Sequence, residues 1–141
     1  MATLTEDKNR LTRNNSKGFF PDSLPLASGV ELFTGALIGK NAAGYAVEAS
    51  PTVQFVGVNF GYVKNASATA VDEVQRCAIE VGHIEEIAIS AVSTGNIDQP
   101  VYALNDGTVA ITGSAPHCVG KIIDIVGTTA VRALIDPSYN V

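Results

Sequence analysis

Four side chains in the sequence carry a thiol or an imidazole and are the candidates for metal binding or nucleophilic catalysis: Cys77, His83, His117 and Cys118. Structural zinc sites use closely spaced pairs such as C-x₂-C, whose ligands converge from one turn. His117 and Cys118 are adjacent, so on a strand they would point to opposite faces. Cys77 and His83 flank a predicted turn, which leaves their convergence open. We expect the cysteines to be small buried core residues and the histidines to be partly exposed or hydrogen-bonded to nearby groups. We expect no metal and no cofactor.

Paired carboxylates occur at Asp72-Glu73 and Glu85-Glu86. Neighbouring residues on a strand diverge, so neither pair is positioned to share a proton, and a solvated face is expected. The Gly39-Lys40 pair lacks the upstream Gly and the following Ser or Thr of a phosphate-binding loop. The sequence therefore predicts that the chain is not an enzyme. A small enzyme or ligand-binding barrel that uses His117 or Cys118 is the alternative.

The elements that would position these residues are predicted to be β-strands. The chain has 141 residues, of which 46% are hydrophobic but only 6% aromatic, and Val, Ile, Ala, Thr and Gly are prominent. This composition favours thin β-layers over a helical bundle. We expect an all-β fold, with seven to nine short strands in one small barrel or sandwich.

The net charge, the cysteine count and the apolar runs of the chain indicate which partners and which compartment to expect. A net charge of −5 is unlike the basic surface of a nucleic-acid-binding protein. Two cysteines do not make a secreted disulfide framework, and the N-terminus lacks a signal-peptide pattern. No apolar run is long enough to span a bilayer. We expect synthesis in a reducing cytoplasm, with no nucleic-acid or membrane partner.

Residues 1–29 are predicted to form an extended N-terminal arm, and residues 30–141 to form the body. Pro21 and Pro25 bias the residues before them toward extended conformations. The segment 1–18 holds four basic side chains against two acidic ones, although the chain as a whole is acidic. Apolar side chains at 19–20, 24 and 26 follow. A disordered tail is the alternative for this segment.

Within the body, strands are predicted at 36–38, 45–48, 55–60 and 129–135. Asn105-Asp106-Gly107 lies between the short β-type runs 101–104 and 108–112. Asp-Gly in this context predicts a hairpin with a type I′ turn, which needs positive φ at both central residues. Residues 71–90 favour two strands, 73–80 and 83–90, joined near Gly82. A short helix over 71–81 is the alternative.

The sequence also contains an internal echo. The shift that carries position 44 to position 107 is called the repeat shift below. It places Gly44 on Gly107 and, in the same way, Val56-Gly57 on Val119-Gly120. With a one-residue gap, Asn41 pairs with Asn105. The echo predicts a duplicated unit made of a hairpin and a following strand.

One stretch resembles a known family. It covers about residues 84–135, with a weaker echo in 36–60, and it resembles the C-terminal half of tailed-phage head decoration (cement) proteins. In that family a "G-D-P-V-Y" strand, a turn, "V-G" and a final valine-rich strand recur. The matching segments here are Gln99-Pro100-Val101-Tyr102, Asn105-Asp106-Gly107-Thr108-Val109, Val119-Gly120 and Val131–Leu134. Asp98-Gln99-Pro100 replaces the Gly-Asp-Pro start, so the leading Gly is missing.

The resemblance implies a small β-barrel or β-tulip body, without catalytic residues, that sits on the outer surface of a phage capsid. Such proteins are often trimeric, are assembled in the host cytoplasm, and stabilise the capsid lattice by clamping neighbouring subunits. The implied partners are the major capsid protein and further copies of the chain, with a homotrimer favoured over a homodimer. An extended N-terminal arm is typical of the family.

The arm holds the candidate capsid-binding residues. Its basic side chains would face an acidic capsid surface, and its apolar side chains would act as pegs when the arm pairs with capsid strands. These residues are Lys8, Arg10, Arg13, Lys17, Phe19, Phe20, Leu24 and Leu26. A different phage virion module, in a tail tube, spike or fibre base, is the alternative function.

Overall fold

The structure, a computed structural model, describes residues 22–67, 72–114 and 117–140. It is all-β apart from two short 3₁₀ helices, η1 (Thr94–Asn96) and η2 (Pro137–Asn140). The strands are β1 (Ser23–Leu26), β2 (Glu31–Leu32), β3 (Leu37–Lys40), β4 (Ala46–Glu48), β5 (Gln54–Asn59), β6 (Val63–Lys64), β7 (Asp72–Glu80), β8 (Ile84–Ile89), β9 (Pro100–Ala103), β10 (Thr108–Ala110), β11 (Cys118–Val126) and β12 (Ala130–Ile135).

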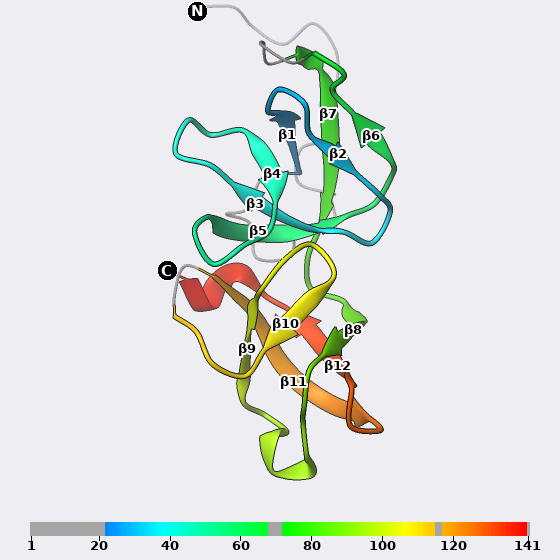
Figure 1. Cartoon of the computed structure of the whole chain (residues 1–141), viewed down its shortest axis with the longest axis vertical. Helices are drawn as coiled ribbons and strands as arrows, with labels where there is room; N and C mark the ends of the chain where they lie inside the picture. The colour runs from blue at the N-terminus through cyan, green and yellow to red at the C-terminus, as the bar shows by residue number, and fades with distance from the viewer. Residues whose placement is uncertain (1–21, 68–71, 115–116, 141) are drawn as a thin grey trace, which may run out of the picture.

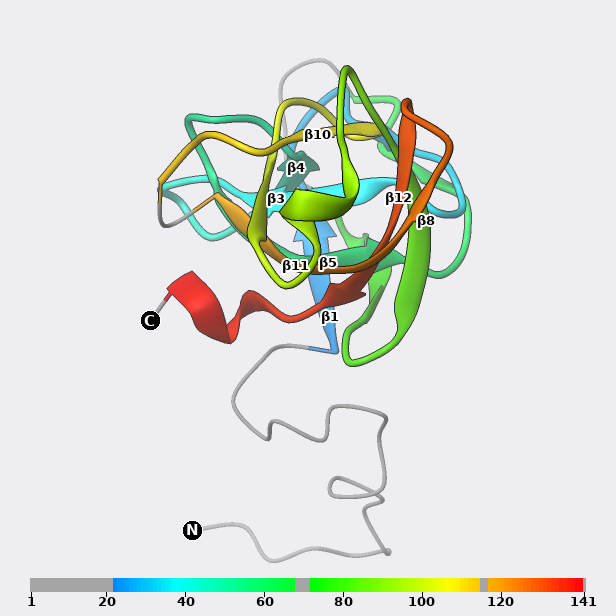
Figure 2. The same ribbon diagram turned by 90° about the horizontal axis from the view of Figure 1, so that it is seen from below.

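The body consists of two closed five-stranded barrels. The first has the strand order β1-β4-β3-β5-β7 and the second β10-β8-β12-β11-β9, while β2 and β6 form a separate two-stranded ribbon. The barrels are stacked along the long axis of the molecule (Figure 1) and overlap in projection when seen along that axis (Figure 2). The all-β prediction is confirmed, but the expectation of one barrel with seven to nine strands is wrong. Strands as short as β2 and β6 leave no alternating pattern in the sequence.

The two barrels have the same topology. Taken in chain order, β1, β3, β4, β5 and β7 correspond to β8, β9, β10, β11 and β12. In each barrel the first and third strands are parallel and all other pairs are antiparallel. The register also repeats, because Ile38 pairs with Gly57 and their counterparts under the repeat shift, Val101 and Gly120, pair with each other. The predicted duplication is therefore confirmed, and it extends to a whole barrel.

The recurring Val-Gly pair marks a position where the backbone excludes side chains. Gly57 and Gly120 have φ values of 153° and 154°. A Cβ at Gly57 would lie 2.9 Å from the carbonyl oxygen of Glu80, and a Cβ at Gly120 would lie 1.7 Å from that of Leu134. The closing strand of each barrel thus passes directly over this glycine.

The hairpin at Asp106-Gly107 is present, but its turn is not type I′. Neither residue has a positive φ. Instead, the Oδ1 of Asn105 accepts a 2.8 Å hydrogen bond from the amide of Gly107, and the amide of Leu104 donates to the carbonyl of Thr108. The side chain of Asn105 therefore shapes the turn. The carbonyl of Asp106 accepts a hydrogen bond of 2.8 Å from the amide of Leu37, in the first barrel.

The segment 71–90 contains the two predicted strands, β7 and β8, and no helix in its described part. Residues 23–26, assigned to the arm from sequence, instead form β1, which pairs with β7 and β4 inside the first barrel. The body therefore begins near Asp22, and residues 1–21 lie outside the described residues. The N-terminal arm itself stays a prediction.

A single hydrophobic core cluster runs through both barrels. Phe55 is its largest buried side chain in the first barrel, and Ile122 and Ile135 are among those in the second. Between the barrels, the Nδ1 of His117 lies 3.0 Å from the carbonyl oxygen of Val53, and the amide of Gly82 donates to the carbonyl of Ile135. These contacts fix the barrels against each other and shape the cleft at their junction.

Candidate functional site

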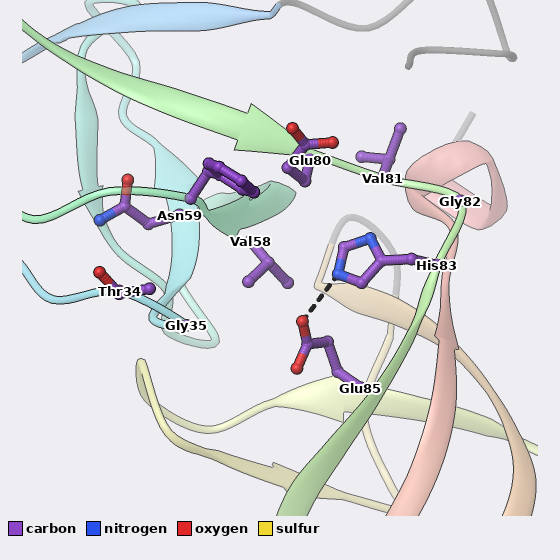
Figure 3. A pocket seen from close by; sticks show the side chains of 10 residues that line it. Thr34, Gly35, Val58, Asn59, Glu80, Val81, Gly82, His83 and Glu85 are labelled. Carbon is purple, nitrogen blue, oxygen red and sulfur yellow. Dashed lines mark hydrogen bonds and ion pairs between the residues drawn. The ribbon is translucent and has the colours of Figure 1, made fainter.

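A cleft of about 770 Å³ opens where the two barrels meet. Its walls come from the loop before β3, the end of β5, the β7–β8 connection and the start of β8 (Figure 3). The lining residues are Thr34, Gly35, Val58, Asn59, Phe60, Glu80, Val81, Gly82, His83 and Glu85. Both barrels therefore contribute to the cleft, and each supplies side chains from a strand end or a connection.

The charged groups of the cleft are acidic. His83 and Glu85 point toward each other (Figure 3), with 2.8 Å between the Nε2 of His83 and the Oε1 of Glu85. Glu80 lies on the opposite wall, at the end of β7. Among the described lining residues, none is Lys or Arg. The cleft therefore offers two carboxylates, only one of which has an imidazole partner within it.

Asn59 ties the loop before β3 to the end of β5. Its side chain is 1% exposed, and its Nδ2 donates to the carbonyl oxygens of Leu32 at 3.1 Å and Phe33 at 2.9 Å. Its Oδ1 has no hydrogen-bond partner among the described residues. In the second barrel the repeat shift places Ile122, a core residue, at this position. The buried amide is therefore a feature of the first barrel alone.

Three large aromatic side chains are exposed beside the cleft, and together they form what we call the aromatic surface. Phe33 is 59% exposed, Phe60 66% and Tyr62 55%. The rings of Phe33 and Tyr62 lie 5.3 Å apart between centroids, inclined by 49°. The hydroxyl of Tyr62 donates to the carboxylate of Glu31, and this hydrogen bond raises the pKa of Tyr62. Clustered exposed aromatics of this kind mark interaction sites.

The aromatic surface is not required by the barrel fold. Under the repeat shift, the second barrel has Asn96, Ile123 and Ile125 in place of the three aromatic residues. Asn96 there has a local role, because its Oδ1 accepts a hydrogen bond from the amide of Ser93. Both barrels close with the same strand order. The cluster of exposed aromatic side chains is therefore a feature of the first barrel and not of the shared barrel topology.

Of the eight predicted capsid-binding residues, the structure describes two. Leu24 is half-buried on β1, where its carbonyl accepts a hydrogen bond from the thiol of Cys77. Leu26 is fully buried in the core of the first barrel. Its assignment as an exposed peg is therefore corrected: it stabilises the body. The other six lie outside the described residues: Lys8, Arg10, Arg13, Lys17, Phe19 and Phe20.

The cysteines and histidines do not form a common site. Cys77 and Cys118 are buried, and burial raises the pKa of each thiol above its ordinary value. His117 contacts the carbonyl of Val53, whereas the thiol of Cys118 donates to the carbonyl of Gly120. The described part of the chain holds no cluster of three or more His, Cys, Asp or Glu side chains suited to a metal ion. Within the same residues, no helix has the length and apolarity needed to cross a membrane.

No family model, curated protein or solved structure matches this chain. The cleft and the aromatic surface were not expected from the sequence. The signal that could have found them is the comparison of the two repeats, since the aromatic residues at positions 33, 60 and 62 have no aromatic counterparts under the repeat shift.

Proposed function

We propose that this chain is a structural virion protein that binds the outer surface of a phage capsid and stabilises the capsid lattice. One observation carries the proposal. The segment that resembles the head decoration proteins, about 84–135, coincides with strands β8 to β12, which form one complete closed barrel. A small β-barrel is the kind of body that the resemblance implies. The weaker echo in 36–60 falls in a second barrel of the same topology.

In this proposal the arm, residues 1–21, supplies capsid contacts and the barrels supply a rigid body. The arm precedes Asp22, whose carbonyl already pairs with the amide of Ile79 on β7. A chain that leaves a sheet in this way can continue as an added strand on a neighbouring protein. Lys8, Arg10, Arg13 and Lys17 meet acidic capsid groups, and Phe19 and Phe20 provide apolar anchors.

The partner in the proposal is the major capsid protein, together with further copies of the chain, a trimer being favoured. Each copy can bind modestly, because an oligomer engages several lattice sites at once. The role is architectural and involves no catalysis.

The test is binding to phage heads that lack this protein, measured by co-sedimentation. The full chain is compared with a chain lacking residues 2–21. The deletion must stop before Asp22, because a longer one removes β1 from the first barrel. We expect the full chain to sediment with the heads and the shortened chain to stay in the supernatant. Equal binding by a folded, shortened chain would refute the role of the arm.

A second measurement separates head from tail. Gold-labelled protein is bound to virions and located by negative-stain electron microscopy. We expect label spread over the head lattice. Label confined to the tail would replace this proposal with a tail tube, spike or fibre-base role.

A further inference from the structure

We propose that Asp106-Gly107 is a site of spontaneous backbone isomerisation and that the fold slows this reaction. Two contacts provide the restraint, one from the side chain of Asn105 and one from the backbone of Leu37. The pair lies in the β9–β10 hairpin, where Gly107 is exposed and Asp106 is half-buried, so water reaches it. The inference concerns the protein in solution and does not rest on the capsid assignment.

The reaction of an Asp-Gly pair requires no enzyme and no cofactor. The backbone nitrogen of Gly107 loses its proton and attacks the side-chain carboxyl carbon of Asp106, one water leaves, and a succinimide ring closes. Water then adds to one of the two ring carbonyls. When it adds to the former main-chain carbonyl, the original bond to Gly107 breaks and the chain continues through the Asp106 side chain, as an isoaspartyl link. One water is lost and one is gained. Glycine favours the attack because no Cβ crowds the nitrogen.

The first restraint acts on the attacking nitrogen. The amide of Gly107 donates a hydrogen bond of 2.8 Å to the Oδ1 of Asn105. The nitrogen attacks only after it has lost this proton, so the reaction must give up the hydrogen bond. A net hydrogen-bond contribution of the usual size corresponds to a roughly 2- to 10-fold slower reaction. The side chain that shapes the turn therefore also protects it.

The second restraint acts on the peptide group between the two residues. The carbonyl oxygen of Asp106 accepts the hydrogen bond of 2.8 Å from the amide of Leu37, in the first barrel. Any rotation of this peptide group about the Cα–C bond of Asp106, to bring the nitrogen onto the carboxyl carbon, breaks that hydrogen bond. The contact between the barrels thus opposes ring closure, and a local opening of the hairpin must precede it.

The hairpin of the first barrel shows that the turn itself requires no Asp-Gly pair. There the Oδ1 of Asn41, the counterpart of Asn105, accepts a 3.0 Å hydrogen bond from the amide of Ala43. The residue between them is Ala42, which has no carboxyl group. Of the two corresponding hairpins, only the one that contacts the other barrel carries the reactive pair. An Asp106→Ala chain should therefore fold normally.

The test measures the isoaspartyl link at position 106 after the full chain is kept in warm, neutral buffer. The two forms of the peptide have equal mass but separate by chromatography, and electron-transfer fragmentation identifies the isoaspartyl link. The wild type is compared with Asn105→Ala and Asn105→Asp, and Asp106→Ala is the blank. The same chains in guanidinium chloride give the rate without the fold, and circular dichroism checks that the chains in plain buffer are folded.

We expect the native wild type to isomerise more slowly than the unfolded wild type. Asn105→Ala removes the acceptor, so its native rate should be roughly 2- to 10-fold higher than that of the wild type. That rate should still lie below the rate of the unfolded variant, because the contact with Leu37 remains. Asn105→Asp keeps an oxygen acceptor and should retain the slow native rate. In guanidinium chloride these three chains should react equally fast.

Each comparison can overturn the proposal. Absence of the isomer from the unfolded wild type would refute the site, and equal native and unfolded wild-type rates would refute protection by the fold. An Asn105→Ala rate equal to that of the wild type, or an Asn105→Asp rate as high as that of Asn105→Ala, would refute the role of the side chain. A difference between the variants that persists in guanidinium chloride would assign the effect to local sequence instead of the fold. If Asn105→Ala does not fold, the wild-type and Asn105→Asp comparisons still decide. No measurement involves capsids, so a failure here is distinct from a failure to bind heads.

Discussion

The amide nitrogen of Leu37 donates a 2.8 Å hydrogen bond to the carbonyl oxygen of Asp106. The donor begins β3 of the first barrel, and the acceptor lies at the tip of the β9–β10 hairpin of the second. This bond joins two barrels that share one continuous hydrophobic core. The duplicated halves are therefore expected to unfold together.

Replacing Gly120 by Ala should destabilise the whole chain. A Cβ there would lie 1.7 Å from the carbonyl oxygen of Leu134, at a φ of 154°. Overpacking and backbone strain together should cost roughly 2–5 kcal/mol. Urea denaturation followed by circular dichroism should show one transition at a lower midpoint. Gly61→Ala, where a Cβ would meet nothing within 4 Å, is the control and should change stability little. Two separate transitions would contradict the coupling of the barrels.

Asp98 is the only residue other than glycine with a positive φ, 71°, among the described residues. Its counterpart in the first barrel is Gly35, with φ 87°. The amide of Asp98 donates to the carbonyl of Ile122 and the amide of Gly35 to the carbonyl of Asn59, each at 2.8 Å. Asp98→Val should therefore cost about 1–2 kcal/mol, because a β-branched residue is strained there.

Asp98→Gly should change stability by less than about 1 kcal/mol, because relief of strain is offset by a more flexible unfolded chain. The ion pair of Asp98 with Lys121, at 3.6 Å, contributes little, since the Asp98 side chain is 77% exposed. Thermal unfolding of both variants checks the order. A Val variant as stable as the Gly variant would show that the turn relaxes without strain.

Deleting residues 2–28 should open the first barrel and so unfold the chain, whereas deleting residues 2–21 should not. The longer deletion removes β1, the strand that pairs with both β4 and β7 and closes the barrel. It also removes Leu26 from the core. Because the two barrels share one core, amide hydrogen exchange should show protected strands throughout the shorter deletion and rapid exchange in the strands of both barrels, β3 to β5 included, in the longer one. Full protection in both would mean that β1 is dispensable.

Stability should fall in alkaline solution because of the two buried thiols. Burial raises the pKa of Cys77 and Cys118 in the folded state, so the unfolded thiols lose their protons first as pH rises. The stabilisation is fully present below the unfolded pKa of about 8.5, and it is lost as pH rises through the folded pKa values. Urea midpoints between pH 7 and pH 11 measure this trend.

A Cys77→Ala/Cys118→Ala double variant should show a weaker decline across the same pH range. In the wild type at pH 8, a thiol reagent should label both cysteines slowly until urea unfolds the chain. Fast labelling of the folded protein would contradict the burial.

The parts of the fold that are predictable from sequence are those where backbone geometry restricts residue type. Gly57 and Gly120 exclude any side chain, so the Val-Gly echo reveals the duplicated unit. The short strands β2 and β6 carry no comparable signal, and the sequence of β1 resembles an arm because its nearby prolines and short length hide its pairing. The type I′ prediction fails because Asn105 and the contact with Leu37 shape the hairpin.

The cleft could not be predicted for a different reason. Its shape depends on how the barrels are placed, and backbone groups such as the carbonyls of Asp106 and Val53 fix that placement. Every residue has the same backbone carbonyl, so these contacts do not depend on residue type and cannot be recognised in the sequence. The exposed aromatic residues do give a signal in the sequence, but it is visible only when the two repeats are compared.

Pro100 limits how far the stacking of barrels can continue. It occupies the position in β9 that Leu37 occupies in β3, and it has no amide hydrogen. The hairpin between β3 and β4 points away from the second barrel (Figure 1), so the contact between barrels is head-to-tail. A head-to-tail contact between like units can add further units without end and produce a filament. The proline removes the donor that a hairpin from the next molecule would need, so a further barrel added along this axis could not repeat the hydrogen bond that joins the two barrels of the chain.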